Sequence, residues 1–145
     1  MRAEMLKDWA ANPVTAPRIH ILTAALEAHQ EGRYVLSIPP LLAQLEGIIA
    51  DGKQPQGGEM RQRTMKEYVA QLAEGDDLIG AHISDFVSNI VLANFIRGQP
   101  IPDLSRHAIL HGAATTYGTE LNSIKTILTF DYVQDLLTPD VSGSA

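Results

Sequence analysis

The chain has 145 residues, and 45% of them are hydrophobic, which is enough to fill one core without disulfides or metal ions. Its 11 Lys and Arg residues against 17 Asp and Glu give a net charge of -6, which argues against broad nonspecific binding to nucleic-acid phosphates but permits a local basic cleft. The lack of cysteine excludes disulfides, zinc–thiolate sites and cysteine nucleophiles, so any metal would need His, Asp or Glu ligands.

We expect neither a membrane span nor a secretory signal. No run of about 18 apolar residues occurs, and the N-terminal residues are too charged and mixed to form the apolar centre of a signal peptide. We therefore expect a cytoplasmic protein without membrane partners.

In the first half of the chain, apolar residues recur at helical spacing, and short clusters of proline and glycine separate the segments. The spacing predicts a helix over 17–30, which Gly32 ends, and a second over 34–51, which is kinked at Pro39 and Pro40 or begins near them. Residues 52–58 then form a loop. A shorter amphipathic helix over 60–73 is predicted to face inward with Met65, Tyr68, Val69 and Leu72.

The second half repeats this alternation of helix and break. A long apolar helix is predicted over 77–96, with Leu78, Ile83, Phe86, Val87, Ile90 and Val91 among its core residues, and Gly98 closes it. Asp103 is predicted to cap a short helix that runs to about Ala113. The last helix starts with Thr119 as its cap and ends before Pro139, with a core stripe formed by Leu121, Ile124, Ile127, Leu128, Val133 and Leu136.

The pattern predicts an all-α fold. No segment alternates with the period of two that a strand requires, so we expect no sheet. Long helices joined by short loops favour an up-and-down helical bundle of four to six helices. We place this bundle at 17–138, with an N-terminal tail at 1–16 and a C-terminal tail at 139–145.

The strongest local signal for chemistry is the group Arg106, His107 and His111, in a chain with only five histidines. An arginine holds a phosphate and stabilises negative charge on it, while a histidine accepts or donates a proton near neutral pH. In RNA the 2′-hydroxyl is an internal nucleophile, so a base, an acid and a cation suffice for cleavage without a metal or other cofactor.

Other interpretations of these residues stay open at this stage. In one of them Arg106 is a surface or capping residue, and both histidines are ordinary parts of a helix. His107 and His111, four apart, share one helix face as zinc ligands can, but no third ligand is evident. Ile109 and Leu110 are expected in the core.

The stretch Arg106-His-Ala-Ile-Leu-His111-Gly112 resembles the signature of the HEPN superfamily, in which an arginine, a polar residue and a few mostly apolar residues lead to a histidine. The segment Tyr34-Val-Leu-Ser-Ile-Pro-Pro-Leu-Leu-Ala-Gln-Leu-Glu-Gly47 is similar to the Glu-bearing bundle helix of bacterial HEPN-like proteins. The likeness spans roughly Pro17 to Leu137.

The resemblance implies a HEPN-like bundle that dimerises so that two motifs meet, and often a metal-independent endoribonuclease of phage defence or toxin systems. It implies that Arg106 binds the scissile phosphate, that His111 transfers protons and that Glu46 orients the arginine or the histidine. His107 stands where Asn or Asp is more usual. The toxin subgroup modified on tyrosine carries that tyrosine two positions after the histidine, where this chain has Ala113.

Residues five apart on a regular helix point about 140° apart, so Arg106 and His111 of one protomer need not complete a site, and a symmetric homodimer is expected. The first functional hypothesis is thus an RNA-cleaving enzyme, with an antitoxin or a fused effector domain as possible partner. The alternatives are a non-catalytic HEPN dimerisation or RNA-binding module, and a histidine-based metal protein.

Overall fold

The computed structural model describes residues 2–54, 57–58, 61–74, 78–92 and 104–137. Within these ranges the protein is an all-α helical bundle without strands, as the periodicity predicted. The helices are α1 (Arg2–Ala11), α2 (Ile19–Gln30), α3 (Tyr34–Lys53), α4 (Gln62–Leu72), α5 (Leu78–Phe86), α6 (Arg106–Leu110) and α7 (Glu120–Leu136), with a 3-10 turn at Ala16–Arg18 and a π-helical stretch at Val87–Val91.

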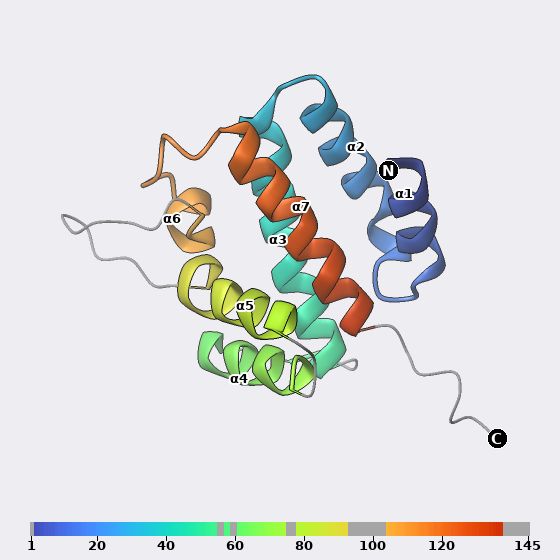
Figure 1. The fold of residues 1–145 in the computed structure, drawn as a ribbon, viewed down its shortest axis with the longest axis vertical. Coiled ribbons are helices and arrows are strands. Elements are labelled where there is room, and N and C mark those ends of the chain that lie inside the picture. Colours follow the sequence, from blue (N-terminus) through green and yellow to red (C-terminus); the bar gives the residue numbers. More distant parts are fainter. Residues whose placement is uncertain (1, 55–56, 59–60, 75–77, 93–103, 138–145) are drawn as a thin grey trace.

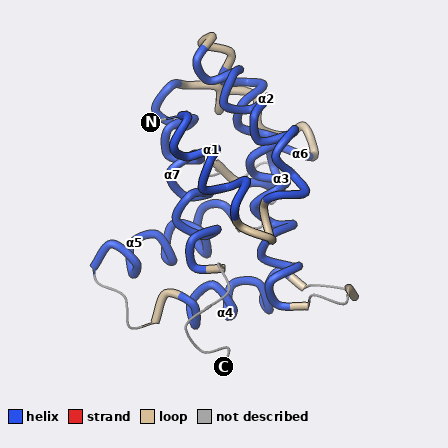
Figure 2. The backbone as a smooth tube through the Cα atoms, turned by 90° about the vertical axis from the view of Figure 1, so that its right-hand side faces the viewer, coloured by secondary structure: helices blue, strands red, loops and turns tan. Residues whose placement is uncertain are grey.

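Helices α3 and α7 form the centre of the bundle (Figure 1). Helices α1 and α2 pack against one part of this pair, while α4 and α5 lie at the other end, and α6 rests beside α3 (Figures 1 and 2). In the part of the chain that the structure describes, no helix has the length and apolar character needed to cross a membrane.

Helix α3 supplies the largest share of the core because its apolar residues repeat at three- and four-residue steps. Its fully or almost fully buried apolar side chains are Ile38, Leu41, Leu42, Leu45, Ile48 and Ile49. The predicted inward residues Met65 and Val69 of α4 are buried as well, and Tyr68 and Leu72 pack against the core.

Helix α3 begins at Tyr34, upstream of both prolines, and contains them. Pro39 has no N–H to donate to the carbonyl of Val35. The hydroxyl of Tyr117 donates to that carbonyl instead, at 3.3 Å. The loop before α7 thus compensates for the proline, and Gly118 packs so closely there that an added Cβ would lie 2.5 Å from Cγ1 of Val35.

The expected N-terminal tail is wrong, because residues 2–11 form α1 and pack on the bundle. Trp9 is fully buried, its ring meets that of Phe130 edge to face at 4.9 Å, and its Nε1 donates to Asp131 at 2.8 Å. A single large aromatic residue therefore anchors a helix whose other residues are mostly polar or small. The expected C-terminal tail at 139–145 lies outside the described residues.

Several predicted core positions are also wrong. Leu78 is 79% exposed, Leu110 is 42% exposed, and on α7 the exposed set is Leu121, Ile124 and Leu128. Helix α7 instead turns a mixed face inward, with Asn122, Ser123, Thr126, Phe130 and Gln134 buried beside Ile127 and Val133. Thr119 does cap this helix, since its hydroxyl accepts from the amide of Asn122 at 3.1 Å.

Candidate active site

The group Arg106, His107 and His111 lies on and just after α6, which is shorter than predicted and ends at Leu110. The predicted cap Asp103 lies outside the described residues, and Ser105 caps the helix, its hydroxyl accepting from the amide of Ala108 at 3.3 Å. Leu104, Ala108 and Ile109 are buried against the bundle, whereas Leu110 and His111 are exposed. One face of α6 is thus anchored, and the histidines lie on the other.

Gly112 ends α6 in a way that fixes where His111 lies. Its φ of 75° is in the left-handed region, which glycine adopts at little cost. The amide of Gly112 donates to the carbonyl of Ile109 at 3.2 Å, and the amide of Ala113 donates to that of Ala108 at 2.8 Å. These two bonds form a Schellman motif, so His111 is held as the last residue before a sharp change of direction.

Arg106 is paired with Glu46, which lies in the middle of α3. The distance from Arg106 Nε to Glu46 Oε2 is 2.7 Å, and the two side chains are 17% and 31% exposed. Nε is buried and makes no hydrogen bond of normal geometry with any residue that the structure describes, so the contact is an ion pair held mainly by Coulomb attraction. The pair also offsets the unfavourable position of a cation at the start of a helix.

His107 and His111 stack on each other, as residues four apart on one helix face can. Their ring centroids are 4.4 Å apart and the ring planes are 24° from parallel. Desolvation lowers the pKa of His107 below its usual 6.5, and the nearby His111 and Arg106 lower it further, while Glu46 acts in the opposite direction. His107 is therefore biased toward its neutral form, which can accept a proton.

The structure brings all four predicted site residues to α6, the residue that follows it and the facing part of α3. His107, whose role was the least certain from the sequence, interacts electrostatically with the other three. Arg106 points to Glu46 rather than to His111, as the angular separation of five helical residues predicts. The environment of His107 depends on contacts with residues far away in the sequence. Nothing in the sequence around His107 predicts these contacts.

The remaining polar candidates do not join this group. His20, His82 and Asp85 are exposed on α2 and α5. His29 packs instead against α7, where its Nδ1 lies 2.8 Å from the hydroxyl of Ser123. Among the residues that the structure describes, no three His, Asp or Glu side chains are grouped closely enough to hold a metal ion.

Comparison with known proteins gives no relative from which to infer a role: no protein-family model matches the chain, and neither a curated protein nor a solved structure is significantly similar to it.

Proposed function

We propose that this protein is a metal-independent endoribonuclease of the HEPN type, acting in phage defence or as a toxin, with RNA as its substrate. The observation that carries the proposal is the environment of His107: an imidazole with a lowered pKa, stacked on a second imidazole and next to a paired arginine. This combination supplies a base, an acid and a cation, which are the groups that RNA cleavage requires.

In this chemistry the 2′-oxygen of a ribose attacks the adjacent phosphorus and loses its proton to a base. The bond from phosphorus to the 5′-oxygen breaks, and that oxygen receives a proton from an acid, which leaves a 2′,3′-cyclic phosphate and a 5′-hydroxyl. Arg106 would stabilise the charge that grows on the phosphate oxygens. The neutral His107 suits the role of base, and His111 that of proton donor.

The stacked geometry supports a composite site from two protomers. In-line displacement requires the attacking and leaving oxygens on opposite sides of the phosphorus, so base and acid must approach from opposite directions. His107 and His111 of one protomer lie on the same helix face. A second copy, related by a twofold axis, would bring an imidazole to the other side of the phosphate and would cover the exposed side of α6.

The ion pair with Glu46 favours one competing function. An arginine whose charge is already neutralised can serve a non-catalytic module that only dimerises or binds RNA. That module would bind RNA without turnover, and the two functions therefore differ in whether product forms.

The test is cleavage of a pool of total RNA by the purified full chain in the presence of a chelator. We expect fragments with 2′,3′-cyclic ends, and we expect Arg106→Ala and His111→Ala to lower the rate by about 100-fold or more, which is typical of losing a charge-stabilising or acid–base group. His82→Ala is the matched control because His82 is exposed on α5, outside the site. Cleavage that persists in both site variants contradicts the proposal, and RNA binding without cleavage supports the non-catalytic module.

A further inference from the structure

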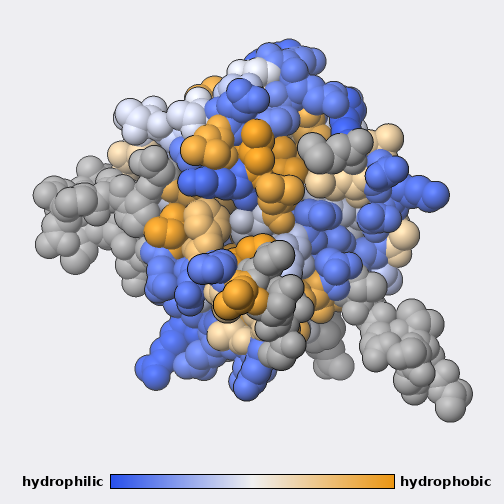
Figure 3. Space-filling view, viewed as in Figure 1, coloured by the Kyte–Doolittle hydropathy of each residue, from blue (hydrophilic) through white to orange (hydrophobic). Residues whose placement is uncertain are grey.

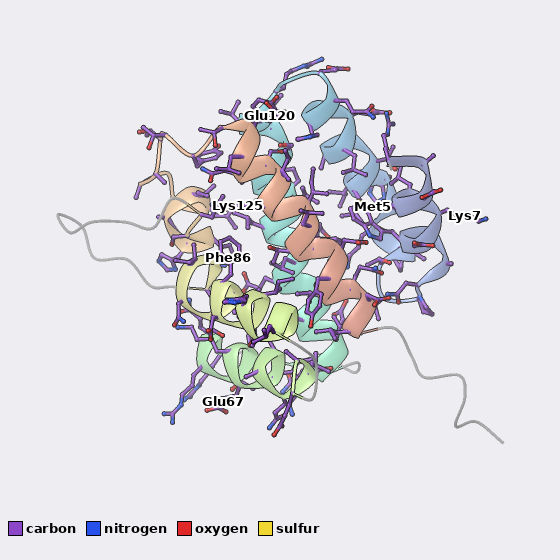
Figure 4. All side chains as sticks on the ribbon, in the orientation of Figure 1. Met5, Lys7, Glu67, Phe86, Glu120 and Lys125 are labelled. Carbon is purple, nitrogen blue, oxygen red and sulfur yellow. The ribbon has the colours of Figure 1, made fainter. Side chains whose placement is uncertain are left out.

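A cavity of about 450 Å³ lies between α1, α2, the start of α3 and α7, and it shares no lining residue with the α6 site. Its apolar lining comes from Met5, Leu26, Ile124, Ile127 and Leu128. In Figure 4, Met5 projects from α1 toward α7, and Glu120 lies at the first turn of α7. Figure 3 shows hydrophobic residues gathered on the surface above this part of the bundle. The volume suits a small organic molecule.

One polar group of this cavity, His29, is held by a chain of hydroxyls. Nδ1 of His29 lies 2.8 Å from Oγ of Ser123, which lies 2.6 Å from Oγ of Ser37, and Ser37 donates to the carbonyl of Tyr34 at 3.2 Å. Both serines are fully buried. With the proton of Ser37 on that carbonyl, Ser123 donates to Ser37, and the Nδ1–H of His29 donates to Ser123. In this arrangement Nε2 is the ring nitrogen of His29 that can accept a hydrogen bond.

Two further acceptors line the cavity. In the described part of the chain, neither the hydroxyl of Tyr34 nor the carboxylate of Glu120 has a hydrogen-bond or ion-pair partner. Tyr34 is held in place by its ring, whose centroid is 5.5 Å from that of His29. The cavity thus offers a ring nitrogen, a hydroxyl and a carboxylate, all three of which can accept a hydrogen bond from a ligand.

Among the described residues of the lining, Arg2 is the single lysine or arginine, and its side chain is already engaged. It forms an ion pair with Glu27 at 3.0 Å and donates to the side-chain oxygen of Gln30. Its charge is therefore largely compensated, and the field in the cavity is dominated by the acceptors. A carboxylate ligand would find no free cation there, whereas an ammonium group would find acceptors for its three N–H bonds.

We propose that this cavity binds a small organic ammonium ion with an apolar tail, such as an arylalkyl or alkyl primary amine. The ammonium group sits among Nε2 of His29, the Tyr34 hydroxyl and the Glu120 carboxylate, and the tail packs on the apolar lining. This site goes beyond the proposed nuclease function, and its test does not depend on RNA cleavage.

The experiment is a titration of the full chain with three probes of similar size: 2-phenylethylamine, the neutral 2-phenylethanol and the anionic phenylacetate. Binding is followed by the backbone amide NMR signals of α2 and α7. We expect the amine to bind most tightly and phenylacetate most weakly, with shifts at residues that line the cavity. Equal affinity for phenylacetate and the amine, or no shift in the cavity with the amine, overturns the proposal.

The variant Glu120→Gln tests whether the negative charge of Glu120 contributes to binding of the amine. Glu120 is exposed, so we expect the variant to fold. We expect its affinity for the amine to be about 3- to 10-fold lower, which is the range for a solvent-accessible charged hydrogen bond. The affinity for 2-phenylethanol should stay unchanged. Asp135→Asn removes the same charge from the other end of α7, away from the cavity, and is the matched control. An equal loss of amine affinity in both variants contradicts the site.

Discussion

The charge state of His107 depends on burial and on three neighbours, and each neighbour can be changed without deleting the imidazole. His111→Gln removes a neighbour whose Coulomb interaction lowers the pKa of His107, so we expect that pKa to rise toward 6.5. Glu46→Gln removes the one group that raises it, so the pKa should fall further. The histidine C–H signals in an NMR titration report both shifts.

The same lowered pKa has a consequence for stability. In the folded state His107 binds fewer protons than an unfolded imidazole does at a pH just below 6.5. The stability that it contributes is therefore present above pH 6.5 and is lost as the pH falls through the folded pKa. A pKa of His107 at or above 6.5 in the intact protein would contradict the geometry of the site.

The Arg106–Glu46 ion pair is predicted to stabilise the fold modestly. A double-mutant cycle with Arg106→Met and Glu46→Gln should give a coupling of about 1 kcal/mol in urea unfolding, because both side chains are partly shielded from water. The exposed pair Arg63–Glu67 on α4 is the matched control, and its coupling should be below about 0.5 kcal/mol. Equal couplings would show that burial does not strengthen the pair.

At the scale of the elements, the loop before α7 is tied to α3 at the position that Pro39 leaves without a partner. Tyr117→Phe removes the hydroxyl that donates to the Val35 carbonyl, and we expect it to lower the free energy of unfolding by about 1 kcal/mol. In a Pro39→Ala background, the new amide can donate to the Val35 carbonyl. Tyr117→Phe should therefore lower the free energy of unfolding clearly less in that background. An equal cost in both backgrounds would mean that Tyr117 acts only through its ring.

Helical periodicity and local signals predicted most of the elements. The stop at Gly32, the cap at Thr119 and the inward residues of α4 follow from spacing and backbone chemistry within a few residues. The orientation of α7 does not follow, because its apolar residues are spread around the helix and a partly polar face is buried. Only contacts with other helices decide which face turns inward, as between Ser123 and Ser37, 86 positions apart.

The candidate site was predictable to a similar extent. Arg106, His107 and His111 are close in sequence, so their grouping follows from one short segment. The pairing of Arg106 with Glu46 was expected only from the resemblance to a family. The environment of His107 and the cavity near His29 depend on helices that meet far from one another in sequence, with His29 and Ser123 separated by 94 positions.

At the scale of the whole molecule, α1 closes the bundle through Trp9. We expect Trp9→Ala to lower the free energy of unfolding by about 3–5 kcal/mol, since it removes a fully buried ring, its edge-to-face contact and a hydrogen bond to Asp131. Lys7→Ala is the control on the same helix, because Lys7 is exposed and points away from the bundle (Figure 4). Equal urea midpoints for the two variants would contradict the anchoring role.

At the α6 site, the proposed activity depends on the 2′-hydroxyl of RNA as the nucleophile. The most direct measurement compares, in chelator, the cleavage of an oligoribonucleotide that the protein cuts with that of the same oligonucleotide carrying one deoxyribose at the cut position. We expect the first to be cut to a 2′,3′-cyclic phosphate and the second to stay intact at that position. Equal cleavage of both, or cleavage of the first that survives the loss of Arg106 and of His111, would contradict the proposed activity.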